Sequence, residues 1–539
     1  MIEINGKSVY NSLAMGRLFF LNKEKDPVKR KKIENIKAEV QRVTNARETA
    51  RAELQELYQK ALVSVGETNA EVFQIHIMML DDEDFFGAIT NMITMQSVNG
   101  EFAVAHTADI FARTFGNMAD EYMRARAADV KDISERLVKI LSGEDGSEEE
   151  LAPNSIIVAP DLTPSETVQL DIDKVSGFIT FFGSQTSHTS IIARTMNLPA
   201  IICTGEISAE YHGRTAIIDG SSGTIYIDPD ENKIEDFKHR KKMEEERAEL
   251  LRLQCGKPTE TKSGRRINLY ANIAYPRDLR AVLANDSEGI GLFRSEFLYL
   301  ESKDFPTEDQ QFERYKEVAE AMGQKTVIIR TLDIGADKQI DYFNLPCEDN
   351  PALGYRAIRI CLSDKPLFKT QLRAILRASA FGNISIMFPM ITSQKEVTAA
   401  KSCLKECMQE LESEGIPFNP QIQVGIMIET PAAAIISDLL AREVDFFSIG
   451  TNDLTQYTLA ADRQNSRLEE FIDIRHEAIL RLIDMTVKNA HKEGIWVGIC
   501  GELATDSKLC KRFVEMGVDE LSVTPSEVLR VRERIRSIE

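Results

Sequence analysis

The sequence predicts a multidomain α/β protein, in which a small α/β domain with an inserted all-helical domain precedes a (β/α)8 barrel. Three observations predict this architecture. The 539 residues exceed what one hydrophobic core usually serves, so several domains are expected. Residues 23–145 carry helical patterns throughout, and strand-like runs lie on both sides of them. From about residue 262 onward, short apolar strand candidates alternate with helical patterns eight times.

The N-terminal part begins with strand-like sequence and then becomes helical. Residues 1–22 contain short apolar runs, after which Asp26 and Pro27 match a helix start, with Asp as N-cap and Pro in the first helical position. A charged pattern without further proline continues to about Ser64. We therefore expect residues 23–145 to form a helical bundle, whose charged faces are either solvated or a docking surface for another protein. The later helices are expected at 67–80, 83–95, 99–116 and 118–142.

A small α/β domain and a connecting helix are expected next. Strand candidates and helical patterns mix within residues 146–229, and the strands of residues 1–22 are expected to return to the same domain. A highly charged helix then leads onward, and we assign residues 230–260 to this linker. The strand candidates are 155–158, 177–182, 200–203, 216–219 and 224–227.

Residues 261–539 match a (β/α)8 barrel in pattern and in size. Eight β-then-α units fit the usual length of this fold, about 250 residues. Because the active sites of such barrels lie at the C-terminal ends of the strands, the residues there are the first candidates for chemistry. The strand candidates are 267–273, 289–293, 326–331, 384–389, 424–429, 445–449, 495–499 and 519–523.

The composition excludes several classes of function. The 65 Lys and Arg against 85 Asp and Glu give a net charge of −20, which argues against nucleic acid as the main ligand. The eight cysteines form no C-x-x-C pair, which favours free thiols in a reducing compartment. No apolar run approaches the ~20 residues of a membrane-spanning helix, and the first residues lack a signal pattern. We therefore expect a cytoplasmic protein without membrane insertion.

Polar residues stand at the predicted strand ends of the barrel. Arginines converging there would hold a doubly charged phosphate through forked hydrogen bonds. Each arginine alone is more often part of a surface salt bridge, whereas their joint presence on one face favours a phosphate site. Arg294, Arg330, Glu429, Asn452, Asp453 and Cys500 stand at or just after strands, and Arg356 and Arg463 lie in longer loops.

Three of these residues indicate more specific chemistry. Glu429 and Asp453 are hard carboxylate ligands that suit Mg²⁺, which binds a few protein oxygens and completes its octahedron with substrate and water. Cys500 is a candidate proton donor, unless its thiol serves packing instead.

One histidine has surroundings that suit phosphoryl transfer. His188 lies between the strand candidate 177–182 and a helical pattern, and hydroxyl residues surround it. A phosphate carried there would meet backbone N–H groups and the positive end of a helix dipole, and imidazole is a competent nucleophile near neutral pH. An isolated histidine at such a turn more often only satisfies local hydrogen bonds. The other six histidines lack these surroundings.

An ordered series of motifs resembles the Enzyme I family of the sugar phosphotransferase system, the phosphoenolpyruvate-protein phosphotransferases. The resemblance extends over essentially the whole chain. The motifs are 161–167, 186–190, 289–297, 330–335, 354–359, 425–431, 450–457 and 500–503.

The resemblance implies that phosphoenolpyruvate binds in the barrel mouth. Glu429 and Asp453 would hold Mg²⁺ next to the substrate, and Cys500 would protonate the departing enolate to give pyruvate. Arg356 would assist in neutralising charge. The substrate itself would be held by Arg294, Arg330, Asn452, Asp453 and Arg463.

The resemblance also implies how the phosphoryl group moves. His188, on a swivelling α/β domain, would attack phosphorus, and Thr167 would support the phosphorylated ring. The domain would then turn to a phosphocarrier protein, HPr, docked on the helical domain, in the first step of sugar uptake. A homodimer formed through the barrel is implied as well.

Three segments depart from the family pattern, although none removes a residue with an assigned role. Gln185 stands where the family usually has Arg, residues 11–16 replace a typical Ser-Pro-Gly opening, and residues 471–476 lack a frequent Asn-Pro. Two alternatives stay open. A pyruvate phosphate dikinase or phosphoenolpyruvate synthase would carry a nucleotide-binding domain before the histidine, and none is visible. A regulatory protein that lost its chemistry should have lost some of the site residues.

Overall fold

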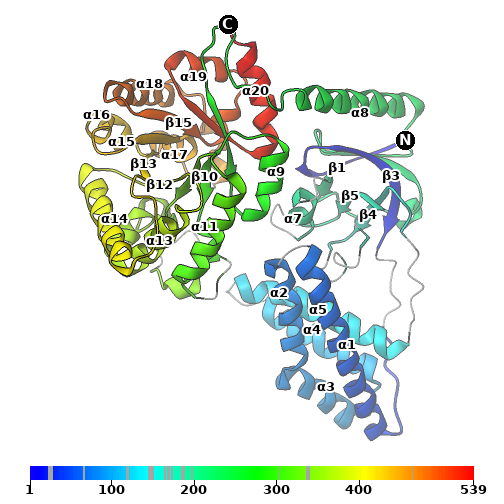
Figure 1. Ribbon diagram of the computed structural model, residues 1–539. Coiled ribbons are helices and arrows are strands. Elements are labelled where there is room, and N and C mark those ends of the chain that lie inside the picture. Colours follow the sequence, from blue (N-terminus) through cyan, green and yellow to red (C-terminus); the bar gives the residue numbers. More distant parts are fainter. Residues whose placement is uncertain are drawn as a thin grey trace. The chain divides into compact units, whose positions relative to one another are not determined.

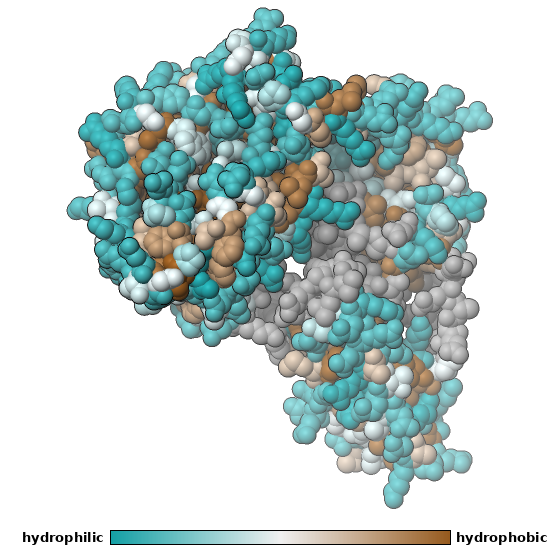
Figure 2. Space-filling view, in the orientation of Figure 1, coloured by the Kyte–Doolittle hydropathy of each residue, from teal (hydrophilic) through white to brown (hydrophobic). Residues whose placement is uncertain are grey.

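The computed structural model divides the chain into two compact units, Met1–Glu244 and Glu245–Glu539 (Figure 1). Among the described residues, no helix is long and apolar enough to cross a membrane. The face seen in Figure 2 is mainly hydrophilic, with scattered apolar patches. The described residues are 1–21, 28–64, 67–116, 121–143, 151–162, 166, 170–171, 174–183, 188–195, 198–300, 302, 304–335, 340–346, 348–463 and 465–539.

A helical bundle forms part of the first unit, as the fold predicted from the sequence requires (Figure 1). Its helices bury apolar side chains such as Val43, Phe73, Ile89 and Leu137 in one core. Amphipathic helices of this kind owe most of their stability to such packing rather than to intrinsic propensity. The helices are α1 (Ile36–Ser64), α2 (Glu67–Leu80), α3 (Glu83–Gln96), α4 (Gly100–Gly116) and α5 (Glu121–Ser142).

The first helix begins later than the sequence predicted. Asp26 and Pro27 lie outside the described residues, and α1 begins only at Ile36. Lys32 instead forms a backbone bridge to the connection between α3 and α4, and the Asn35 side chain caps the helix by accepting a backbone N–H at 3.1 Å. The predicted helix was wrong for residues 28–35, which form no helix and include the bridge at Lys32.

The strands of the first unit form one mixed sheet in the order β1-β8-β7-β3-β4-β5-β6-β2. The N-terminal strand β3 pairs in parallel with β4 and antiparallel with β7, so the start of the chain returns to the strands that follow the helical bundle, as predicted. The strands are β1 (Ile2–Asn5), β2 (Lys7–Tyr10), β3 (Leu13–Phe20), β4 (Ser155–Ala159), β5 (Val175–Thr180), β6 (Ala200–Ile202), β7 (Thr215–Asp219) and β8 (Thr224–Ile227). Helix α7 (His188–Thr195) follows β5.

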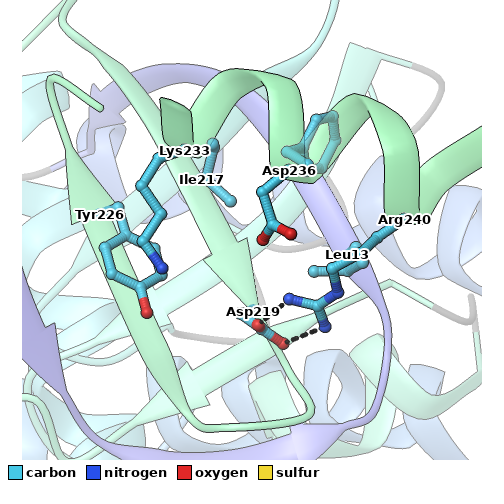
Figure 3. A pocket seen from close by; sticks show the side chains of 8 residues that line it. Leu13, Ile217, Asp219, Tyr226, Lys233, Asp236 and Arg240 are labelled. Atoms are coloured by element: carbon cyan, nitrogen blue, oxygen red, sulfur yellow. Dashed lines mark hydrogen bonds and ion pairs between the residues drawn. The ribbon is translucent and has the colours of Figure 1, made fainter. Parts of the chain in front are cut away.

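A long charged helix, α8 (Glu231–Arg252), follows β8, and its first half packs on this sheet (Figure 3). The Arg240 guanidinium binds both carboxylate oxygens of Asp219 at 2.5 and 3.2 Å, and the Lys233 ammonium lies 4.2 Å from the ring centre of Tyr226. Burial opposes ionisation of Asp219, but hydrogen bonds from Arg240 and Ser221 outweigh it and lower the pKa of the carboxyl to about 2. Specific polar contacts therefore hold this half of the helix on the sheet.

Arg240→Ala is expected to destabilise the first unit by ~1 kcal/mol at neutral pH, a value kept small because the pair is partly solvated. The contribution exists only while Asp219 is ionised. It should therefore be complete above about pH 4 and be lost as the pH falls toward 2. Thermal unfolding midpoints of wild type and variant across this range measure the effect. If the difference in unfolding midpoint between wild type and variant stays the same near pH 2, the ion pair of Arg240 with ionised Asp219 is not its cause.

The second unit is a closed barrel of eight parallel strands, in the order β10-β11-β12-β13-β14-β15-β16-β9. Each strand overlaps one of the eight candidates predicted from the sequence, so the predicted barrel is confirmed. The strands are β9 (Asn268–Ile273), β10 (Ile290–Arg294), β11 (Val327–Arg330), β12 (Ile384–Phe388), β13 (Gln423–Ile428), β14 (Phe446–Gly450), β15 (Trp496–Cys500) and β16 (Glu520–Val523).

Helices surround the barrel (Figure 1), and a small apolar cluster, which includes Leu292 and Phe446, fills its interior. The inner cluster includes Leu292, Ile328, Met427 and Phe446, whereas a larger core lies between the strands and the helices. A barrel filled in this way is a rigid support for side chains at its rim. The helices are α9 (Leu279–Ala284), α10 (Glu296–Leu300), α11 (Glu308–Met322), α12 (Ile358–Ser363), α13 (Lys365–Ala378), α14 (Gln394–Glu414), α15 (Pro431–Ile435), α16 (Ser437–Leu440), α17 (Thr451–Leu459), α18 (Glu477–Lys492), α19 (Cys510–Met516) and α20 (Val528–Ser537).

Candidate active site

The closed barrel brings the predicted site residues to one rim. Arg294, Arg330 and Cys500 are the last residues of β10, β11 and β15. Glu429 directly follows β13, and Asp453 lies in the first turn of α17, which begins where β14 ends. Because all eight strands are parallel, their carboxyl ends meet on the same face of the barrel. Residues far apart in the sequence are thus gathered in one mouth.

Arg330 is held by two acidic residues. One end of its guanidinium lies 2.5 Å from Glu296 Oε1, and the other lies 3.0 Å from Asp333 Oδ2. Burial disfavours the charge, but these two carboxylates outweigh burial and raise the pKa of Arg330 above its already high usual value. The guanidinium is therefore permanently charged and fixed in orientation, as recognition of a phosphate demands.

Arg356 shares one of these acidic partners. Its Nη2 lies 2.8 Å from Asp333 Oδ1, so a single carboxylate orients two buried arginines. Burial disfavours the Arg356 charge as well, but Asp333 outweighs it and raises the pKa of Arg356. The roles of Glu296 and Asp333 were not predicted from the sequence. Their position, two or three residues after a strand-end arginine, is the signal that could have revealed them.

Two further arginines at the mouth are less closely paired than Arg330 and Arg356. Arg294 is exposed and has no ion pair among the described residues. Partial loss of hydration and the positive charge of Arg330 lower the pKa of Arg294. Arg463 is also exposed, with its guanidinium 4.0 Å from Asp453 Oδ1 and its backbone N–H bound to Gln456 Oε1 at 3.1 Å. An anionic ligand in the mouth would relieve the repulsion between these cations.

Glu429 and Asp453 fit a divalent cation. Glu429 is fully buried, and its Oε1 accepts the Met390 N–H at 2.6 Å. Its Oε2 is buried without a hydrogen-bond partner among the described residues. Burial and the negative charge of Asp453 raise the pKa of Glu429 to about 8. An orphaned buried oxygen beside a second carboxylate suits a hard ion such as Mg²⁺, which would supply the missing positive charge.

Two neutral side chains complete the rim. Cys500 is buried, its Sγ lies 3.6 Å from the Ile449 carbonyl oxygen, and burial raises the pKa of the thiol to about 12. It therefore keeps its proton at neutral pH, as a proton donor must. Asn452 is fixed by Glu502, whose backbone N–H donates to Asn452 Oδ1 at 3.2 Å.

The histidine predicted to carry the phosphoryl group lies in the first unit. His188 is the first residue of α7, which follows β5, so its backbone lies at a helix N-terminus as predicted. Its side chain, and all of Thr167 and Gln185, lie outside the described residues.

Three family profiles match the chain in sequence order. Residues 5–126 match the N-terminal domain of the PEP-utilising enzymes, residues 151–223 their mobile domain and residues 248–539 their PEP-binding domain. The chain is also 42% identical to a phosphoenolpyruvate-protein phosphotransferase of Priestia megaterium, covering 99% of this chain and 94% of the relative. The chain belongs to the phosphoenolpyruvate-protein phosphotransferase family.

A second relative agrees with this assignment. The phosphotransferase of Bacillus subtilis strain 168 is 42% identical, covering 100% of this chain and 95% of the relative. A solution structure of an Enzyme I protein, determined by NMR, is 31% identical, covers 45% of this chain and 99% of its own, and superimposes with a TM-score of 0.40. The protein is thus a phosphotransferase that uses phosphoenolpyruvate. The match over the whole chain favours this activity over a dikinase or a regulatory protein without chemistry.

Proposed function

We propose that this phosphotransferase transfers the phosphoryl group of phosphoenolpyruvate to His188 and then to a histidine of the phosphocarrier HPr, as the first step of sugar uptake in the cytoplasm. The observation that carries the proposal is the cationic rim, where the buried, oriented Arg330 and Arg356 lie beside the metal-suited pair Glu429 and Asp453. Phosphoryl transfer depends on positioning and charge neutralisation more than on covalent help, and this rim supplies both.

Different residues of the rim would bind the phosphate and the metal ion. Arg294, Arg330 and Arg463 neutralise the phosphate, Asn452 donates to it, and Arg356 adds positive charge. Glu429 and Asp453 would hold Mg²⁺, which withdraws negative charge from the phosphoryl oxygens when it is bound. The arrangement of charges on the rim and the family membership support these proposed roles.

The chemical step breaks one bond and forms another. The imidazole of His188 attacks phosphorus, the bond from phosphorus to the enol oxygen breaks, and the enolate of pyruvate leaves. The Cys500 thiol then donates its proton to the methylene carbon, which gives pyruvate, and solvent returns a proton to the sulfur. Thr167 would support the phosphorylated ring.

Each part of the chain has its own role in this proposed reaction. Residues 1–22 and 146–229 carry the histidine, 23–145 dock HPr, 230–260 link the units, and 261–539 bind phosphoenolpyruvate. A histidine that serves both the barrel and HPr must move between them, so these parts swivel relative to one another. We further propose that the protein forms a homodimer through the barrel.

Incubating the chain with radiolabelled phosphoenolpyruvate, Mg²⁺ and HPr tests the proposal. Label should reach the chain first and then HPr as acid-labile phosphohistidine, and continuous pyruvate release should need HPr. Without HPr, release should stop after about one equivalent per chain. Chelating the metal with EDTA should stop labelling, and added Mg²⁺ should restore it. A labelled chain that leaves HPr unlabelled would show that the acceptor is another protein.

A further inference from the structure

A buried glutamine lies behind the two strand ends that carry arginines. Gln371, on α13, is 1% exposed, and its Oε1 accepts the backbone N–H of Leu332 at 2.9 Å. Its Nε2 donates to Ser295 Oγ at 2.9 Å and to the Tyr315 hydroxyl at 3.1 Å. One amide thus joins the residues just beyond β11 to those just beyond β10.

Two of its three partners, Ser295 and Leu332, are neighbours of the charged groups in the mouth. Ser295 stands between Arg294 and Glu296, and Leu332 directly precedes Asp333. Glu296 and Asp333 are the two carboxylates that hold Arg330. The strands β10 and β11 pair directly, with Arg294 opposite Arg330, and Gln371 is bound to the two segments that follow these strands and carry Glu296 and Asp333.

The surroundings leave the amide a single orientation. A backbone N–H can only donate, so the oxygen of Gln371 must face Leu332 and the nitrogen must face Ser295 and Tyr315. Tyr315 is fixed in turn, because its hydroxyl donates to Gln311 Oε1 at 3.2 Å. The side chains of Ser295, Tyr315 and Gln311 are fully buried, so water has no access to replace a lost bond.

We propose that Gln371 is a positioning residue for phosphoenolpyruvate binding, which holds the segments after β10 and β11 in place and so orients the guanidiniums of Arg294 and Arg330 toward one phosphate. It does not touch the substrate and acts only through Ser295 and Leu332. The inference rests on the proposed function in one respect, namely that these arginines hold phosphoenolpyruvate.

Gln371→Met tests this, because methionine has a similar length and shape but makes no strong hydrogen bond. We expect the affinity for phosphoenolpyruvate, measured by calorimetry in the presence of Mg²⁺, to fall ~10–100-fold. Each variant is measured in the His188→Ala background, in which no phosphoryl transfer to the chain takes place, and HPr is left out. If the methionine variant does not fold, Gln371→Asn serves instead, since its shorter amide cannot reach both partners and should show the same loss.

A matched control separates positioning from stability. Ser379 is a buried polar residue at the C-terminal end of the same helix, and its hydroxyl accepts the Asn419 N–H at 2.9 Å. Ser379→Ala should lower the thermal unfolding midpoint in a similar way but leave the affinity for phosphoenolpyruvate unchanged.

A double-mutant cycle with Arg294→Met decides the mechanism. If Gln371 acts through the arginines, the double variant should lose less affinity than the product of the two single losses. Multiplying effects, or an unchanged affinity in Gln371→Met and Gln371→Asn, would overturn the positioning role while the proposed function stands. A wild-type protein that binds no phosphoenolpyruvate would overturn both.

Discussion

His188→Ala is expected to abolish labelling of the chain by radiolabelled phosphoenolpyruvate. Phosphoryl transfer to a protein needs a nucleophilic side chain that forms a bond to phosphorus, and alanine offers none. Water alone could replace it as acceptor, and the label would then leave as inorganic phosphate. The measurement is acid-labile label retained on the chain after denaturation.

Two control measurements test whether the loss of labelling is due to the missing nucleophile. His239→Ala removes an exposed histidine on α8 and should leave labelling at the wild-type level. His188→Ala should still bind phosphoenolpyruvate with wild-type affinity, because the cationic rim belongs entirely to the barrel. Label retained in His188→Ala would mean that another residue receives the phosphoryl group.

Arg330→Met is expected to have two effects. It should make the barrel less stable, and it should abolish the binding of phosphoenolpyruvate. The substitution leaves Glu296 buried without its counter-ion and Asp333 paired with Arg356 alone, and uncompensated buried charge typically costs ~3–5 kcal/mol. Phosphoenolpyruvate binding is lost because the mouth no longer contains the guanidinium that Glu296 and Asp333 hold in a fixed orientation. Urea unfolding followed by circular dichroism measures the first effect, and calorimetry with phosphoenolpyruvate and Mg²⁺ measures the second.

Arg463→Met is the matched control, since both residues are rim arginines with a proposed phosphate contact. Arg463 is 44% exposed and its nearest carboxylate is 4.0 Å away, so its loss should weaken binding with little effect on stability. Equal destabilisation by the two substitutions would contradict the view that the Glu296–Arg330–Asp333 cluster stabilises the barrel.

The sequence predicted the barrel because its strands are short, apolar and regularly spaced by helices. Buried parallel strands produce a repeating pattern of this kind in the sequence, whereas local capping signals predict helix boundaries less reliably. The helix expected to continue from Asp26 and Pro27 was wrong for residues 28–35, which form no helix and where Lys32 pairs with the connection between α3 and α4. The strand-end arginines and carboxylates could be found because barrel chemistry lies at one end of the strands.

The sequence by itself determined which residues reach the rim, since strand position fixes the end of the barrel at which a side chain lies. Only the tertiary structure decided which charges pair there. Asp333 serves both Arg330 and Arg356, and Gln371 binds Ser295 from 76 residues away. The physical reason is that hydrogen bonds and ion pairs depend on distances between side chains from separate elements, and closure of the barrel sets those distances.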